Sequence, residues 1–221
     1  MKPNNSDDPV KTRIAAGKNP KKRRQILDAA ARVFAAVGFD KAAMDDVCTE
    51  AGTSKSTLYV YFPSKEHLFA ALVCEERDRY VQEFMAILRD PTQPAETLFR
   101  FGCHLARRLT SRRVVRAHRT ILSVAERLPE IGMDFYAKGP ERSLDFLAEY
   151  LKGVEKAGLL RFDDPRRAAS QLSDLVTSGL LKPRLFGVIT EDPSEAELEA
   201  SVTSAVRLFM AGYAVDRPQA G

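Results

Sequence analysis

The chain lacks any apolar stretch long enough to cross a membrane. Its longest fully apolar run is seven residues, Leu68 to Cys74, whereas a membrane-spanning helix needs about 20. No apolar segment follows the charged N-terminus, so it does not resemble a secretory signal. Cysteines are also few, and none of Cys48, Cys74 and Cys103 lies in Cys-x-x-Cys spacing. This usage argues against a disulfide framework and a structural zinc site and favours a reducing cytoplasm.

Motifs of the common enzyme and cofactor-binding classes are absent as well. The sequence has no Gly-x-Ser-x-Gly, no His-Glu-x-x-His, no P-loop and no Gly-x-Gly-x-x-Gly. Its three histidines, His67, His104 and His118, are too scattered to suggest a metal site or a Cys/His pair. We therefore predict a protein that is not an enzyme and uses no cofactor or metal. An all-α enzyme stays an alternative, which turnover of a bound molecule would support.

The excess of positive charge belongs to the N-terminal part of the chain. The net charge is only +4, from 34 Lys and Arg against 30 Asp and Glu. Residues 1–73 carry 12 basic and 8 acidic residues, whereas residues 74–221 carry 22 of each. Within the first 25 residues the count is 8 against 2. A basic end beside a neutral body indicates that one end binds an anionic partner.

Apolar residues recur at helical spacing through most of the chain, so we predict an all-α fold. Residues 1–18 are polar and interrupted by proline, and we expect a flexible basic arm there. Residues 19–64 are predicted to form a three-helix helix-turn-helix DNA-binding domain. A larger helical domain for effector binding and dimerisation is predicted over 65–215, with a tail at 216–221.

Capping residues, prolines and glycines divide these domains into helices. Asn19 with Pro20 begins the first helix and Gly38 ends it. Ser64 and Asp164 are further predicted N-caps, and Ser194-x-x-Glu197 is a capping box. We expect three helices within 20–61, then helices at 65–88, 94–110, 112–126, 129–136, 140–157, 165–182 and 195–214.

The segment from Met44 to Phe62 is the most informative part of the sequence. Apolar residues from Met44 to Ala51 share one face of a short helix, and Gly52 permits a sharp turn. Ser54 can cap a second helix, on which Leu58 and Phe62 point inward. A helix, a glycine-containing turn and a second helix form a helix-turn-helix.

The outer face of the second helix distinguishes this segment from a purely structural hairpin. It gathers a cation, two hydroxyl groups and a tyrosine within five residues, a set that suits the major groove of DNA. Four cations also cluster at the start of the first helix, where the positive end of the helix dipole makes them unfavourable. This local cost is easier to understand if DNA phosphates are the partner. A solvated helix face is the alternative. The predicted DNA contacts are Lys55, Ser56, Thr57 and Tyr59, with Lys21, Lys22, Arg23, Arg24 and Lys65 near the backbone.

The same segment closely resembles the signature of the tetracycline-repressor (TetR) family of transcriptional regulators. The resemblance covers about 20–73 and is carried above all by Ala51-Gly52-Thr53-Ser54-Lys55-Ser56-Thr57-Leu58-Tyr59-x-Tyr61-Phe62-x-Ser64-Lys65-Glu66. It implies that Lys55, Ser56, Thr57, Tyr59 and Tyr61 contact DNA and that Lys65 contacts phosphate.

One position departs from that signature. The family usually has Thr or Ser just before the helix at Met44, where this chain has Ala42 and Ala43. A hydroxyl contact with phosphate is therefore in doubt, and the helix cap is either missing or supplied by Asp40.

The C-terminal body resembles a branch of the same family. The segment from Ala125 to Arg142 is similar to the C-terminal domain of AefR-like repressors, more loosely than the first match. That resemblance implies a helical domain that dimerises and encloses a small-molecule pocket. Each candidate for the pocket could equally be plain core. The candidates are Phe84, Met85, Leu88, Phe99, His104, Ile121, Phe135, Phe146 and Tyr150.

Two late helices carry broad apolar stripes, which suit a four-helix dimer interface with two helices from each subunit. Packing of both stripes within their own subunit is the alternative. We favour the interface because a two-fold reader of DNA must be a dimer. The residues predicted at the interface are Leu172, Leu175, Val176, Gly179, Leu198, Val202, Ala205, Val206, Phe209 and Met210.

Acidic residues are absent from Thr97 to Ala125, where seven arginines occur. Either these arginines pair with carboxylates elsewhere, or some attract an acidic effector or lie near DNA phosphates. The arginines are Arg100, Arg107, Arg108, Arg112, Arg113, Arg116 and Arg119.

The sequence as a whole predicts a homodimeric repressor in the cytoplasm. We expect a small, largely hydrophobic effector to release it from a palindromic operator in double-stranded DNA. A DNA-binding architectural protein without an effector is a further alternative.

Overall fold

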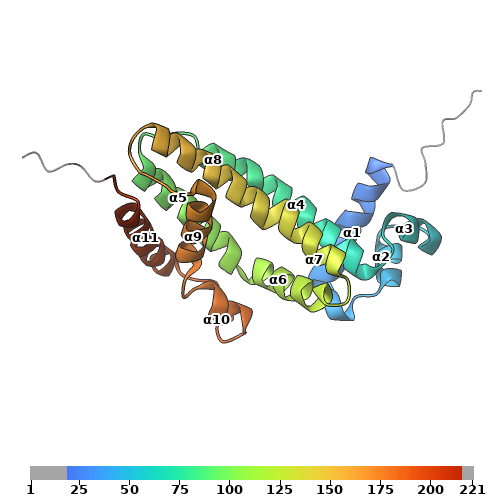
Figure 1. The fold of residues 1–221 in the computed structure, drawn as a ribbon. Helices are drawn as coiled ribbons and strands as arrows, with labels where there is room; N and C mark the ends of the chain where they lie inside the picture. Colours follow the sequence, from blue (N-terminus) through green and yellow to red (C-terminus); the bar gives the residue numbers. More distant parts are fainter. Residues whose placement is uncertain (1–18, 216–221) are drawn as a thin grey trace, which may run out of the picture. The chain divides into compact units, whose positions relative to one another are not determined.

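The computed structural model describes residues 19–215, with the side chains of residues 76–82 left out. The predicted arm and tail, 1–18 and 216–221, lie outside these residues. The chain divides into two compact units, Met1–Leu72 and Val73–Gly221. Within the described range the fold is all-α, as predicted, with eleven α-helices, one π-helical turn and no β-strand (Figure 1). None of these helices is long and apolar enough to span a membrane.

Three helices and the start of a fourth make up the first unit. They are α1 (Pro20–Lys41), α2 (Met44–Glu50), α3 (Lys55–Tyr61) and α4 (Lys65–Ile87). The side chain of Asn19 caps α1, as predicted, by accepting from the backbone N–H groups of Lys21 and Lys22 at 3.0 and 3.2 Å. Gly38 interrupts the helix, as predicted, because its φ of 81° and ψ of 163° are not helical. A further helical turn follows this kink and ends at Lys41, and α1 is named over both parts.

The core of the first unit extends into α4. Leu68 is completely buried beside Ile26, Leu27 and Leu58. Phe69 on α4 packs against the aromatic rings of Phe34 and Phe39 at centroid distances of 5.5 and 4.9 Å. The first unit therefore ends after Leu72, beyond the boundary expected at residue 64.

The second unit contains the remainder of α4 and all later helices. Its helix α8 packs against α9, while α5, α9 and α11 pack against one another, and α6 contacts α7 and α10. The elements are α5 (Pro94–Thr110), α6 (Arg112–Ala125), α7 (Pro129–Tyr136), the π-helical turn η1 (Ala137–Glu141), α8 (Arg142–Lys156), α9 (Pro165–Thr177), α10 (Leu181–Leu185) and α11 (Glu195–Gly212).

Two helix predictions in this unit need correction. The helix expected at 165–182 ends at Thr177, because Gly179 takes the left-handed conformation with a φ of 74° and turns the chain into α10. The helix expected to open at residue 140 is preceded by the π-helical turn, which contains Pro140. Proline has no N–H to donate, and a π-helical turn accommodates this locally.

Gly102 on α5 lies at the point where α5 meets α9 and α11. A Cβ atom at this position would lie 2.6 Å from Cγ1 of Val202 and 3.0 Å from Cγ1 of Val176. Both valines are completely buried and have stiff, β-branched side chains. The three helices approach this closely because residue 102 has no side chain.

We expect Gly102→Ala to lower the free energy of unfolding. Overpacking costs about 1–3 kcal/mol, which exceeds the ~1 kcal/mol of helix propensity that alanine contributes. Gly212→Ala is the matched control, because its added methyl group meets no atom within 4 Å. Urea denaturation followed by circular dichroism measures both. Equal midpoints for the two variants would contradict the close approach of the three helices.

Candidate nucleic-acid interface

The start of α3 is fixed by a hydrogen-bonded cap. The turn between α2 and α3 uses Gly52 at a φ of 54°. The Ser54 hydroxyl accepts from the backbone N–H of Thr57 at 3.2 Å, as predicted for an N-cap. It also lies 2.8 Å from the hydroxyl of Thr57 and 3.1 Å from that of Ser56. Two of the predicted DNA-binding hydroxyl groups are thus held within the cap before any DNA arrives.

The inner and outer faces of α3 differ as the sequence predicts. Leu58 is completely buried, whereas Lys55, Ser56 and Tyr59 are exposed. Tyr61 differs from these three, because it is partly buried and packs against the core of the first unit. Val60 is 52% exposed and was not among the predicted contacts. An apolar residue carries no signal for DNA contact in the sequence, so the exposure of Val60 is the observation that makes it a candidate.

An ion pair joins α2 to α3 across the turn. Nζ of Lys55 lies 2.8 Å from Oδ1 of Asp45, and both side chains are largely exposed. The hydrogen bond and the negative charge of Asp45 raise the pKa of Lys55, which keeps the ammonium group protonated. The predicted cation of α3 therefore has an intramolecular partner that a phosphate would have to replace.

The cationic start of α1 is anchored to the helix-turn-helix. Gln25 donates from Nε2 to the carbonyl of Ala51 at 2.7 Å, at the end of α2. The guanidinium of Arg23 lies 5.6 Å from the ring centroid of Phe62, which follows α3. Arg24 forms an ion pair with Asp28 on the same helix at 3.0 Å. The structure thus brings the basic residues of α1 and the outer face of α3 into one unit.

Lys65 has an internal role that its sequence position did not indicate. Its ammonium group donates to the carbonyls of Phe39, Asp40 and Ala42 at 2.9, 3.3 and 3.0 Å. Nζ also lies 4.6 Å from the ring centroid of Phe39. The three N–H groups of the Lys65 ammonium therefore hold the backbone that connects α1 to α2. Contact of Lys65 with phosphate stays a prediction.

The start of α2 shows how the chain manages without a hydroxyl cap. Ala42 is buried, and Asp46 accepts from the backbone N–H of Ala43 at 2.9 Å. The side chain that serves this end of the helix therefore comes from inside α2. Ala43 offers no side-chain acceptor to the first N–H groups of α2, so the usual cap is missing, which is one of the two outcomes expected, and Asp40 does not supply it.

The predicted effector residues differ in exposure, and two of them, Phe84 and His104, are in contact. Phe84, Ile121 and Tyr150 are buried, and Met85 is 42% exposed. Leu88, Phe99, His104, Phe135 and Phe146 are partly buried. A cavity of about 260 Å³ in this unit is lined by none of these nine residues.

His104 is the histidine of that set. Its ring meets the ring of Phe84 edge-on, at a centroid distance of 5.1 Å, and Nε2 lies 3.1 Å from Oε2 of Glu83. Burial is the main cause of a lowered His104 pKa, and it outweighs the opposing effect of Glu83. The side chains that the structure describes contain no cluster of His, Cys, Asp and Glu that could hold a metal ion.

Most of the residues predicted at a dimer interface lie inside their own subunit. Seven of the ten are buried in the core of the second unit: Leu172, Val176, Leu198, Val202, Ala205, Val206 and Phe209. Leu175 and Met210 are partly buried against that core, and Gly179 is exposed in the turn after α9. Packing of these seven side chains within their own subunit, the alternative given above, accounts for their burial, and their part in a dimer interface stays a prediction.

Comparison with known proteins identifies the family. Residues 26–72 match the sequence profile described as bacterial regulatory proteins, tetR family. Residues 96–215, more than half of the chain, match that of the AefR-like transcriptional repressor, C-terminal domain. The chain belongs to the TetR family. It is a TetR-family transcriptional regulator with a helix-turn-helix unit and a larger helical unit.

Relatives of this TetR-family regulator span nearly its whole length. The HTH-type transcriptional repressor Rv1474c of Mycobacterium tuberculosis is 31% identical over 180 residues, which cover 78% of this chain and 85% of the relative. A putative TetR-family regulator from Mesorhizobium loti superposes with a TM-score of 0.79, at 29% identity, over 88% of this chain and 98% of that one. The flavonoid-responsive regulator FrrA superposes with a TM-score of 0.70, at 31% identity, over 90% and 100%.

The internal role of Lys65 predicts a stability effect in the absence of DNA. Lys65→Met keeps the apolar stem but leaves three carbonyls without their donor. We expect the free energy of unfolding to fall by about 1–2 kcal/mol, because hydrogen bonds to charged groups are stronger than neutral ones. Lys41→Met, at the exposed end of α1, is the control. Thermal denaturation of both proteins without DNA tests this, and equal melting temperatures would assign Lys65 to DNA alone.

Proposed function

We propose that the protein is a homodimeric repressor that binds a palindromic operator and is released by a small, largely hydrophobic effector. The observation that carries this proposal is the outer face of α3. It exposes Lys55, Ser56 and Tyr59 on a helix whose inner side is fixed by completely buried Leu58. Membership of the chain in the TetR family supports the assignment of this helix as the recognition element.

In the proposed complex α3 enters the major groove. Ser56 and Tyr59 reach base edges, and Lys55 leaves Asp45 for a phosphate or a guanine. Exposed Val60 offers an apolar contact to a thymine methyl group. Lys21, Lys22, Arg23 and Arg24 meet the backbone near the start of α1.

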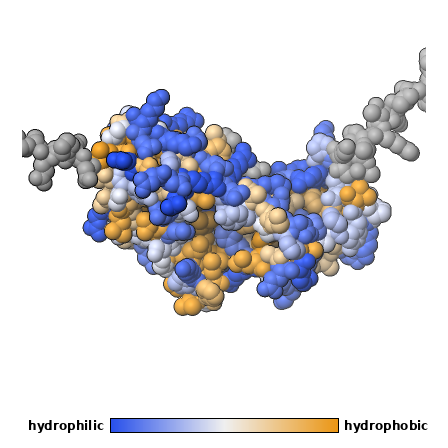
Figure 2. All heavy atoms as spheres, in the orientation of Figure 1, coloured by the Kyte–Doolittle hydropathy of each residue, from blue (hydrophilic) through white to orange (hydrophobic). Residues whose placement is uncertain are grey.

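The proposed dimer uses surfaces that remain outside the subunit core. Leu208 on α11 is 57% exposed, and Phe186 and Val188, after α10, are 84% and 78% exposed. Figure 2 shows hydrophobic side chains gathered over the α10 part of the second unit. Exposed apolar surface of this kind marks sites of association. Two subunits would hold two α3 helices about one DNA turn apart, ~34–36 Å.

The proposed effector acts by favouring one of two dimer shapes. A molecule that binds only the shape with an altered spacing of α3 weakens operator binding through that difference in affinity. The related regulator FrrA is described as flavonoid-responsive. By similarity, we propose an aromatic, largely hydrophobic effector for this chain, bound among the helices that carry Phe84, His104 and Phe135.

Selection of bound DNA from a random pool tests the proposal most directly. A palindromic consensus with half-sites one helical turn apart supports a dimeric operator reader. Tyr59→Ala should relax the base preference within each half-site, because base contacts and not phosphate contacts specify sequence. Recovery of DNA without a shared sequence would instead favour the architectural protein without an effector.

The ion pair of Lys55 gives a second test on the recovered operator. We expect Lys55→Ala to weaken binding and to reduce the slope of log Kd against log salt concentration by about 0.9 per subunit. Asp45→Asn should preserve or strengthen binding, because it removes a negative charge and frees Lys55. Lys152→Ala, an exposed position on α8, is the control and should leave the slope unchanged. Equal slopes for the two lysine variants would place Lys55 outside the interface.

Leu208→Glu tests the proposed dimer surface. A buried, unpaired carboxylate costs several kcal/mol, so we expect this variant to be a monomer at micromolar concentration by light scattering. Leu122→Glu on α6, where the leucine is 63% exposed, is the matched control and should stay dimeric. A monomeric wild-type protein, or dissociation of the control alone, would refute this surface.

A further inference from the structure

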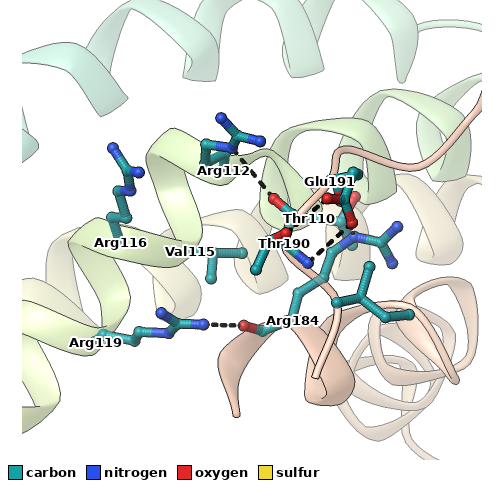
Figure 3. A pocket seen from close by; sticks show the side chains of 9 residues that line it. Thr110, Arg112, Val115, Arg116, Arg119, Arg184, Thr190 and Glu191 are labelled. Atoms are coloured by element: carbon teal, nitrogen blue, oxygen red, sulfur yellow. Dashed lines mark hydrogen bonds between the residues drawn. The ribbon is translucent and has the colours of Figure 1, made fainter. Parts of the chain in front are cut away.

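The cavity of about 260 Å³ in the second unit lies between the start of α6 and the segment that begins in α10. Arg112, Arg116 and Arg119 line it from α6, at spacings that place them on one side of the helix. Arg184 and Glu191 lie across from them (Figure 3). Four guanidinium groups thus surround a space that contains one lining carboxylate.

Arg184 is the most informative of the four. It is only 4% exposed, although arginine is almost never buried without a partner. Its Nε donates to the carbonyl of Glu191 and its Nη1 to the carbonyl of Leu180, both at 2.9 Å. Among the side chains that the structure describes, no carboxylate lies within 4.0 Å of it. Carbonyl oxygens satisfy N–H groups but do not cancel the positive charge.

None of the other three arginines has a carboxylate within 4.0 Å among the described side chains, although the charge of Arg112 acts on Glu191 from farther away. Arg119 donates to the carbonyls of Leu185 and Arg184. Arg112 donates from Nε to the carbonyl of Thr190 at 3.2 Å. The side chain of Arg116 forms no hydrogen bond or ion pair with any residue in the described range. The second unit therefore concentrates positive charge in a hollow, although its sequence carries as many acidic as basic residues.

The nearby carboxylates are committed to other groups. Glu191 accepts from the hydroxyl of Thr190 at 2.7 Å and from its backbone N–H at 3.3 Å. These hydrogen bonds lower the pKa of Glu191, so it stays charged. Asp192 accepts from the backbone N–H of Arg112 at 2.6 Å. Asp192 therefore holds the segment after α10 against α6, whereas the hydrogen bonds of Glu191 stay within that segment.

Four arginines of the 97–125 segment show two different situations. Arg107 forms an ion pair with Glu195, as expected for a solvated face with carboxylate partners. The three arginines that line the cavity from α6 have no such partner among the described residues. Pairing with carboxylates elsewhere in the chain therefore accounts for the first situation and not for the second.

We propose that this cavity binds a small organic acid through its oxyanion. A carboxylate or phosphate ester matches the planar, two-pronged guanidinium of Arg116 and Arg119. Val115 and Ile189 supply an apolar wall for the rest of the ligand. The bound anion connects α6 to the segment after α10. This site is distinct from the proposed hydrophobic effector site and independent of DNA binding.

Calorimetric titration of the full-length protein without DNA tests the site. The probes are benzoate, phenyl phosphate and uncharged benzyl alcohol, which share a ring and differ in the polar group. We expect at least one of the two anions to bind and benzyl alcohol not to bind. The tighter of the two anions identifies the oxyanion as a carboxylate or a phosphate ester.

Variants at the exposed arginines change the site. Arg116→Gln removes no hydrogen bond within the described residues, whereas Arg119→Gln also removes the two hydrogen bonds to the carbonyls of α10, so its melting temperature is measured beside its Kd. We expect Arg116→Gln and Arg119→Gln each to raise the Kd of the anion about tenfold, because each removes a charge-assisted hydrogen bond. Arg100→Gln, an exposed arginine on α5 outside the cavity, is the control and should not change the Kd. Absence of binding by both anions, equal binding of the alcohol, or equal effects of all three variants would overturn the proposal. Because no DNA is present, failure of operator binding has no bearing on these outcomes.

Discussion

The presentation of α3 depends on the burial of its inner side. An isolated helix of seven residues is far too short to be stable in water, where about 12–15 residues are marginal. Leu58 on α3 and Phe62 directly after it are anchored in the core built by α1, α2 and the start of α4. Ser54 caps the first turn, and Gln25 and Lys65 fix the neighbouring backbone. The outer residues of α3 can be polar because none of them is needed for its stability.

Local signals predicted much of this architecture. The caps at Asn19, Ser54 and Ser194 are as expected, because a capping side chain bonds to a backbone N–H only two or three residues away. The end of α9 was missed for an equally local reason. Gly179 and Leu180 continue the apolar spacing of the helix, so periodicity gives no sign that Gly179 turns the chain.

Features that depend on distant partners could not be predicted. Spacing showed that Val176 and Val202 are buried, but it did not show whether their own subunit or a partner buries them. Lys65 binds backbone carbonyls, which every residue has, so its sequence context could not distinguish this role from phosphate binding. Arg107 and Glu195 are 88 positions apart, and only the fold shows that they pair. The exposed set on α3 was predicted because its spacing, residue types and family signature agree.

The close approach at Gly102 determines which helices of the second unit are able to move. Interiors are as dense as organic crystals and resist continuous deformation. Gly102 brings α5 into contact with Val176 on α9 and Val202 on α11. If one of these helices slid past another, the backbone of α5 would press against a branched valine side chain. This close packing therefore favours movement of the three helices together over sliding of one past another. A ligand that changes the shape of this unit is expected to act on the helices attached to these three, α6 and α10 among them.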